Sequence, residues 1–226
     1  MCQPHMPISE IVFFNPALAC AYSSCMQNLD ELLKQAEIAH GHLCAGQVLG
    51  VRMAMLGCVR LGISDPRGKD RKRLVTFVEI DRCATDAISV VTGCRLGKRA
   101  LKFRDWGKMA ATFVDVETGR AVRICARESS KEAARQLHPE IENKNKRQML
   151  AYRELPENIL FTEGWVRVAL GQNEFPGYKS DRAVCAICEE GINYDRYIVR
   201  GGQKLCHGCA FPEARYYQPI EIRRAE

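Results

Sequence analysis

Apolar side chains in the first third of the chain recur with helical spacing on both sides of a short loop rich in cysteine and histidine. From residue 29 to 39, leucine and alanine return every three or four positions between charged residues, which predicts an amphipathic helix. From residue 46 to 61 nearly every residue is apolar, which predicts a second helix buried on most of its surface. The loop between them is therefore expected to lie between two fixed elements.

Further along, runs of apolar and β-branched residues predict a small sheet. Residues 74–80 have the composition of a buried, central strand, and residues 101–103 form a short strand candidate. Residues 111–116 and 121–126 alternate in polarity around a Glu117 to Arg120 turn, which predicts a hairpin. A last strand is predicted over residues 165–170.

The remaining periodic segments predict helices. Residues 84–92 suit a short helix closed by Gly93, since glycine accepts the left-handed conformation that follows many helix ends. Residues 129–155 are charged and helix-prone, and Pro139 splits them, so they are expected to form a two-part helical connector over the surface.

Length and composition predict a medium domain followed by a small module. The 226 residues divide into an extension (1–28), an α+β domain (29–170), a hinge (171–180) and a cysteine-rich module (181–226). No apolar run is long enough for a membrane span and no signal-peptide pattern opens the chain. Twelve cysteines without an export signal therefore favour metal or redox chemistry in a reducing cytoplasm over a disulfide framework.

The net charge of +6 is unevenly distributed, because residues 1–39 carry −3 and the remainder +9. Much of the positive charge lies in two clusters, at residues 67–73 and 95–104. Such clusters attract anions, whether a phosphorylated cofactor, an acidic partner or nucleic acid. A solvated face is the simpler alternative.

Three cysteines stand at predicted element boundaries. Cys44 precedes the second helix, Cys83 joins a strand to a helix, and Cys94 follows Gly93. The positive end of a helix dipole favours thiolate over thiol, which makes Cys44 and Cys83 candidate ligands or nucleophiles. His40 and His42 lie within reach of Cys44 in the sequence. The alternative is a buried, inert thiol beside two loop histidines.

Two Cys-x-x-Cys motifs near the end of the chain predict a metal site. Cys185 and Cys188 are separated by seventeen residues from Cys206 and Cys209, and four thiolates at this spacing can surround zinc tetrahedrally. The interval accommodates a hairpin, with a strand over residues 194–200 and a Gly201-Gly202 turn. Because four protein ligands close the site, its zinc would be structural. A redox-active dithiol pair or an iron–sulfur site is the competing interpretation.

Several short motifs of the first domain occur in one order: His40-Gly41-His42-x-Cys44-x-Gly46, Gly50-x-Arg52, Cys83-x-x-Asp86-Ala87, Thr92-Gly93-Cys94, Gly97-Lys98 and Asp105-x-Gly107-Lys108. Together they resemble the FmdE family of formylmethanofuran dehydrogenase, in its form with an appended zinc finger. The resemblance covers residues 29–126 closely and the C-terminal cysteines by architecture. The chain departs from the family pattern at Ala45, where proline is frequent, and at Arg95, where threonine is common.

The resemblance implies an α+β N-terminal domain, a treble-clef or ribbon-like C-terminal zinc finger, and a homodimer with a site near the interface. It also implies the functional positions, which are His40, His42, Cys44, Cys83, Asp86, Cys94 and Lys98.

These positions suggest a division of roles. His40, His42, Cys44 and Cys83 are expected to hold a second transition metal, an iron–sulfur species or a sulfur cargo, with Asp86 orienting a histidine. Cys94 and Lys98 are expected to handle a substrate or an anion, so the catalytic candidates are Cys44, Cys83, Asp86, Cys94 and Lys98.

Three functions are compatible with these roles. The first is an accessory protein of a molybdenum or tungsten oxidoreductase of the formylmethanofuran dehydrogenase type. The second is a stand-alone enzyme or a metal or sulfur carrier acting through Cys44. The third is a regulatory zinc finger that binds nucleic acid, which is the least favoured because the finger lacks the paired histidines and the helix of a base-reading finger.

Overall fold

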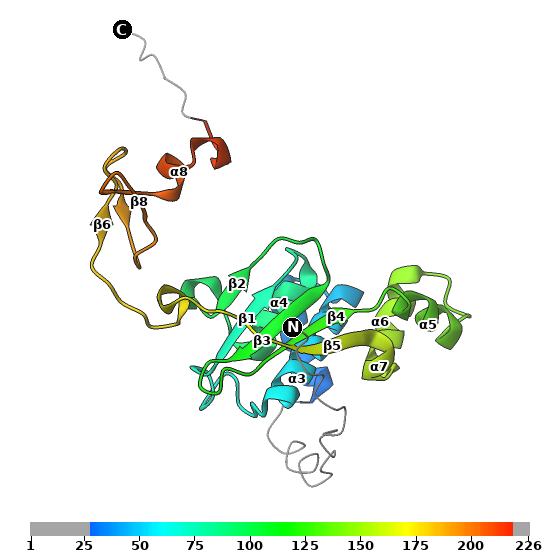
Figure 1. The fold of residues 1–226 in the computed structure, drawn as a ribbon. Helices are drawn as coiled ribbons and strands as arrows, with labels where there is room; N and C mark the ends of the chain where they lie inside the picture. The colour runs from blue at the N-terminus through cyan, green and yellow to red at the C-terminus, as the bar shows by residue number, and fades with distance from the viewer. Residues whose placement is uncertain (1–27, 219–226) are drawn as a thin grey trace, which may run out of the picture. The chain divides into compact units, whose positions relative to one another are not determined.

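The computed structural model describes residues 28–218 and divides the chain into two compact units, residues 1–168 and 169–226 (Figure 1). The extension predicted over residues 1–28 lies outside the described residues except for Asn28. None of the described helices is long and apolar enough to cross a membrane.

Two consecutive helices, α2 (Leu29–His40) and α3 (Ala45–Leu61), confirm the first part of the predicted pattern. The side chain of Asn28 caps α2 by accepting hydrogen bonds from the N–H groups of the first turn, and Gly41 ends it at φ 95°. Cys44 occupies the N-cap position of α3. Because α3 is buried around most of its circumference, it forms the centre of the N-terminal unit.

A five-stranded sheet runs in the order β2-β1-β3-β4-β5. Its strands are β1 (Leu74–Val78), β2 (Leu101–Phe103), β3 (Ala110–Asp115), β4 (Ala121–Ala126) and β5 (Phe161–Val166). The pair β1 and β2 is parallel and is connected through α4 (Cys83–Thr92) and a 3₁₀ turn, η1 (Leu96–Lys98), whereas the other pairs are antiparallel. The carboxyl ends of β1 and β2 therefore meet at one edge of the sheet.

The helix α3 packs against β3 and β4, and α2, α4 and α6 surround it, so the unit is a sheet covered by helices (Figure 1). Close packing is possible at Gly57, where an added Cβ would lie 2.3 Å from the ring of Phe113. The predicted α+β class is confirmed.

Three later helices correct the predicted surface connector. They are α5 (Ser130–Leu137), α6 (Lys144–Glu154) and α7 (Glu157–Leu160). The helix α6 packs on α3, where Ala151 and Tyr152 are buried. Arg52 of α3 donates hydrogen bonds to the carbonyls of Tyr152 and Leu155 and thereby satisfies the C-terminal end of α6. Long polar side chains around two small contact positions concealed this burial in the sequence pattern.

The last strand of the sheet also lies earlier than predicted. The strand β5 spans residues 161–166 instead of 165–170, because its pairing with β4 runs from Phe161 opposite Ala126 to Val166 opposite Ala121. Residues after Val166 pass the start of β4 and have no strand partner there. Tertiary pairing therefore decided these bounds.

The C-terminal unit holds two small hairpins and a short helix. These are β6 (Ala183–Val184) with β7 (Gly191–Ile192), β8 (Ile198–Arg200) with β9 (Gln203–Leu205), and α8 (His207–Ala210). The predicted Gly201-Gly202 turn joins β8 to β9, with positive φ at both glycines. The predicted strand over 194–200 is shorter than expected, because Tyr194 and Asp195 adopt φ 61° and 52° and cannot extend it.

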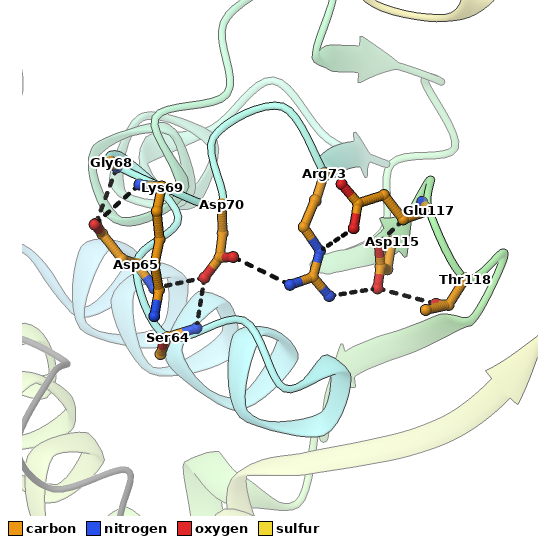
Figure 2. A network of polar contacts seen from close by, with 9 residues as sticks. All are labelled: Ser64, Asp65, Gly68, Lys69, Asp70, Arg73, Asp115, Glu117 and Thr118. Carbon is orange, nitrogen blue, oxygen red and sulfur yellow. Dashed lines mark hydrogen bonds and ion pairs between the residues drawn. The ribbon is translucent and has the colours of Figure 1, made fainter.

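A buried network joins the loop after α3 to the β3–β4 turn (Figure 2). Arg73 donates to Asp70 Oδ1 at 3.1 Å and to Asp115 Oδ2 at 2.8 Å, and it contacts Glu117 at 3.2 Å. Part of the basic cluster at 67–73 is therefore structural. Burial opposes ionisation of Asp70 and Asp115, but the hydrogen bonds that these carboxylates accept outweigh it, so the pKa of each lies below its ordinary value.

Replacing Arg73 by methionine is expected to cost about 3–5 kcal/mol of unfolding free energy, because Asp115 would keep a buried charge without its partner. In the unmodified protein the lowered carboxyl pKa values add stability above about pH 4, which is lost as the pH falls through the folded-state values. Urea unfolding from pH 3 to 7 measures both effects. Arg71→Met is the control, since Arg71 is exposed; equal losses in the two variants would contradict the assignment.

Candidate functional site

The thiols of Cys44 and Cys83 meet at the starts of two helices. Cys44 is the N-cap residue of α3 and its side chain makes no capping hydrogen bond. Cys83 is the first residue of α4, and the Cys44 thiol is its hydrogen-bond partner. Both residues are partly exposed. The fold therefore brings together two cysteines that are thirty-nine positions apart in the sequence.

Two glycines of α3 permit this approach. A Cβ added at Gly46 would lie 3.4 Å from Cys83 Cβ and 3.8 Å from Cys44 Sγ. One added at Gly50 would lie 2.5 Å from the carbonyl oxygen and 2.7 Å from the Cα of Ala84. Since backbone atoms cannot rotate away, Gly50 sets the distance between α3 and the start of α4.

Two histidines and a carboxylate lie at the end of α2, on the other side of the loop. His40 Nδ1 is 2.8 Å from Asp86 Oδ2 of α4, and the His40 and His42 rings are 4.9 Å apart between centroids. The pairing of His40 with Asp86 links the end of α2 to the first turn of α4. Such a carboxylate fixes the orientation of the imidazole it contacts.

Cys83 differs from the expectation based on the helix dipole alone. Burial raises the pKa of its thiol, and the neighbouring Cys44 thiol raises it further. Backbone and Arg82 contributions act in the opposite direction and are outweighed. The prediction that a helix start makes Cys83 a thiolate by itself is therefore wrong, because desolvation and a second sulfur oppose the dipole.

Cys94 and Lys98 lie at the far end of α4 from Cys83. The helix has 10 residues, which corresponds to about 15 Å of rise. Cys94 is 2% exposed, its sulfur accepts a hydrogen bond from Thr76 Oγ1 at 3.5 Å, and it lies 3.5 Å from the Leu74 carbonyl oxygen. The structure therefore places Cys94 in the core instead of beside Cys44, and Lys98 is a neighbour of Cys94.

A buried acid that is not among the predicted site residues anchors the loop nearest this edge of the sheet. Glu79 follows β1 and forms a two-point ion pair with Arg123, at 2.7 and 2.6 Å. Its backbone carbonyl accepts hydrogen bonds from the N–H groups of Trp106 and Lys108. This holds the Asp105-x-Gly107-Lys108 motif to a residue four positions before Cys83. The sequence signal was a lone acid ending an apolar strand.

Among the described residues, one group of cysteine, histidine and acidic side chains has the geometry to hold a metal ion. Its members are Cys185, Cys188, Cys206 and Cys209, whose sulfur atoms all lie within 4.8 Å of one another. The predicted ligand set of the C-terminal unit therefore converges. The thiols of Cys44 and Cys83 have no third ligand atom at that spacing within residues 28–218.

The four sulfur atoms fit a cation. Backbone N–H groups of Cys188, Cys206 and Ile187 stabilise the Cys185 thiolate and lower its pKa to about 6. A backbone N–H from Glu190 favours the Cys188 thiolate, but burial and the adjacent thiols prevail and raise its pKa to about 12. Four thiols this close cannot all ionise without a positive charge among them, and a bound metal ion supplies that charge.

Arg215 is a further residue of this group that the sequence spacing did not reveal. It donates to Cys209 Sγ at 3.1 Å and to the Gly208 carbonyl oxygen at 2.7 Å. An added Cβ at Gly208 would lie 3.2 Å from the Arg215 Nε, so this glycine makes room for the guanidinium. Arg215 therefore offsets thiolate charge from outside the ligand set.

Arg215→Met is expected to weaken metal retention by about 10–100-fold, because the Cys209 thiolate loses its charged donor. Competition with a chromophoric chelator measures the affinity. Arg196→Met is the matched control, since the Arg196 guanidinium lies 5.6 Å from the centroid of the Tyr194 ring and stacks on an aromatic side chain instead of a sulfur. Equal affinities in the two variants would contradict this role.

Comparisons with known proteins agree with the fold and the motifs. The family described as FmdE, molybdenum formylmethanofuran dehydrogenase operon, matches residues 39–162, more than half of the chain. A crystal structure of an FmdE-like protein of tungsten formylmethanofuran dehydrogenase, from Syntrophus aciditrophicus, is similar with a TM-score of 0.56 and 20% identity. The match covers 84% of this chain and 95% of that one, and at this identity it shows the fold alone.

A curated protein of Archaeoglobus fulgidus, described as a probable S-adenosyl-L-methionine-binding protein, is 37% identical over 97 residues. The match covers 42% of this chain and 26% of that protein, so the chain spans about a quarter of this relative's length. With the family match over residues 39–162 and the similar fold, the chain belongs to the FmdE family.

Proposed function

We propose that this protein is an accessory factor of a molybdenum or tungsten oxidoreductase of the formylmethanofuran dehydrogenase type, and that it handles a metal or sulfur cargo at Cys44 and Cys83. The observation that carries the proposal is the meeting of these two thiols at the starts of α3 and α4. The family description supplies the class of partner enzyme. Partly exposed thiols suit transfer of a cargo better than permanent storage.

The N-terminal residues suit a soft or borderline metal. Cys44 and Cys83 would supply two thiolates and His42 an imidazole, and such mixed ligands favour zinc, nickel, iron or copper over magnesium or calcium. His40, held by Asp86 at 2.8 Å, would keep the loop in place beside them. A bound metal would polarise or carry the cargo; the protein would orient it and control access.

In the C-terminal unit, zinc is the metal we propose for Cys185, Cys188, Cys206 and Cys209. Four thiolates in a closed set are typical of structural zinc. The unit would then serve as a folded attachment to the FmdE domain. We also propose the homodimer that the family resemblance implies, which light scattering of the purified protein would test.

A stand-alone carrier acting through Cys44 is the second candidate, and the partial exposure of that thiol favours it. The name of the Archaeoglobus relative adds S-adenosyl-L-methionine as a ligand to test, although its binding region can lie in the three quarters of that protein not matched by this chain. Nucleic-acid binding by the finger is not supported, since residues 169–226 contain eight basic and eight acidic side chains.

Cys44→Ser and Cys83→Ser, each in a protein whose finger cysteines are intact, are expected to lower the metal content by about one equivalent per chain, because either change removes half of the thiolate pair. Elemental analysis of protein expressed without oxygen measures this. Cys125→Ser is the control, since Cys125 is a partly exposed thiol within β4. If all three variants retain the same metal content and thiol reactivity, the proposed site is wrong.

A further inference from the structure

The pair formed by Cys44 and Cys83 has a property beyond metal binding, which is its rigidity. Each thiol begins a helix, and the two helices are held together by backbone contact at Gly50. Gly46 removes a side chain that would stand between them, since its Cβ would lie 3.4 Å from Cys83 Cβ. The two sulfur atoms are therefore neighbours because of helix packing and not because of a chance rotamer.

A disulfide requires Cβ atoms about 3.5–4.5 Å apart and little else from the backbone. The thiol of Cys44 is already the hydrogen-bond partner of Cys83, so a bond between the sulfur atoms needs side-chain rotation and no rearrangement of α3 or α4. No third ligand atom among residues 28–218 lies within 4.8 Å of both sulfur atoms to separate them. The geometry is that of a dithiol able to close on itself.

We infer that Cys44 and Cys83 form a redox-active dithiol that reduces low-molecular-weight disulfides. The sulfur of Cys44, which no capping hydrogen bond engages, attacks one sulfur of the incoming disulfide, and the other sulfur leaves as a thiol with the proton from Cys44. The sulfur of Cys83 then attacks the mixed disulfide. It releases the second small thiol, which takes the Cys83 proton.

The balance of this exchange is closed. Two cysteine thiols are oxidised to one disulfide, and one external disulfide is reduced to two thiols. A small disulfide fits because both cysteines are only partly exposed. Cys58 and Cys94 cannot compete, since they are 0% and 2% exposed within the core.

This activity also deepens the proposed function, on which only the following consequence rests. An oxidised pair has no thiolates to offer, so formation of the Cys44–Cys83 bond would release a metal or sulfur cargo and its reduction would restore the site. Redox state would thereby decide when the site is loaded. The disulfide itself needs no cargo.

The test uses the full-length protein with its finger loaded with zinc, equilibrated without oxygen in a series of glutathione buffers. After acid quenching and alkylation, peptide mass spectrometry measures the peptide linked through Cys44 and Cys83. The ratio of linked to free pair is expected to rise about tenfold for each tenfold rise in the ratio of oxidised glutathione to the square of reduced glutathione. Dithiothreitol should reverse it.

Variants separate an exchange site from a slow side reaction. Cys44→Ser is expected to stop at a glutathione adduct or a free thiol on Cys83, and Cys125→Ser should leave the linked peptide unchanged. Separate glutathione adducts on Cys44 and Cys83 in the unmodified protein, with no link, would overturn the inference. So would a link that forms equally well between Cys83 and Cys125.

Metal content of the reduced protein distinguishes this inference from the proposed function. A linked pair in a protein that binds no metal outside the finger would support the dithiol and refute the metal cargo. A metal bound at Cys44 and Cys83, with no link in any buffer, would overturn the dithiol and leave the cargo role standing.

Discussion

Removal of the metal from Cys185, Cys188, Cys206 and Cys209 is expected to unfold residues 169–226. The buried residues of this unit are few, namely Cys185, Ile192, Leu205, Cys209 and Ala210, and two of them are ligands. So small a core cannot offset the entropy of ordering the chain. Structural zinc supplies about 10–16 kcal/mol in modules of this kind, so its loss exceeds the effect expected of any single substitution in this protein.

A strong chelator, or Cys188→Ser, should therefore expose this unit to protease while the FmdE domain stays folded. The reason is that the core around α3 contains thirty buried apolar residues and none of the four ligands. Limited proteolysis with mass spectrometry locates the cut sites. Cys58→Ala is not a suitable control because it opens a cavity, so Cys125→Ser, a partly exposed site, serves instead. Protection of residues 181–210 without metal would refute the structural role.

Gly50→Ala is expected to destabilise the FmdE domain by about 2–3 kcal/mol, although alanine normally favours a helix over glycine by about 1 kcal/mol. The added Cβ would lie 2.5 Å from the Ala84 carbonyl oxygen, and backbone on both sides prevents relief except by moving α4 away from α3. Cys83 moves with α4. The variant should therefore lose the Cys44–Cys83 pair as well as stability.

Urea unfolding and the yield of the linked peptide measure the two effects of Gly50→Ala together. Gly97→Ala is the matched control, because nothing lies within 4 Å of a Cβ at Gly97 and its φ is not positive. A Gly50→Ala protein as stable as the unmodified one, with the pair intact, would show that α3 and α4 tolerate a wider spacing.

The order of helices and strands was largely predictable, because it depends on periods of apolar residues and on local punctuation. Gly41, Gly62 and Gly93 end α2, α3 and α4 with positive φ, as their place in the sequence indicates. The bounds of β5 and the burial of α6 were not predictable. Both depend on partners distant in the sequence, which are β4 and α3.

The candidate site divides in the same way. Two Cys-x-x-Cys motifs suffice to predict a four-thiol cluster, because each motif places two sulfur atoms on one turn. Arg215 was missed, since its contact with Cys209 depends on the fold of the chain after α8. Cys83 and Cys94 looked equivalent in sequence, yet the ends of α4 have different surroundings.

By itself, the sequence determined the elements of this protein, the four ligands of its C-terminal unit and its FmdE motifs, because these depend on spacing along the chain. Only the tertiary structure decided that Cys83 lies against Cys44 while Cys94 lies in the core. The physical reason is the contact of Gly50 with the backbone of Ala84, which fixes one end of α4 against α3. No local pattern of residues specifies which helix ends will meet.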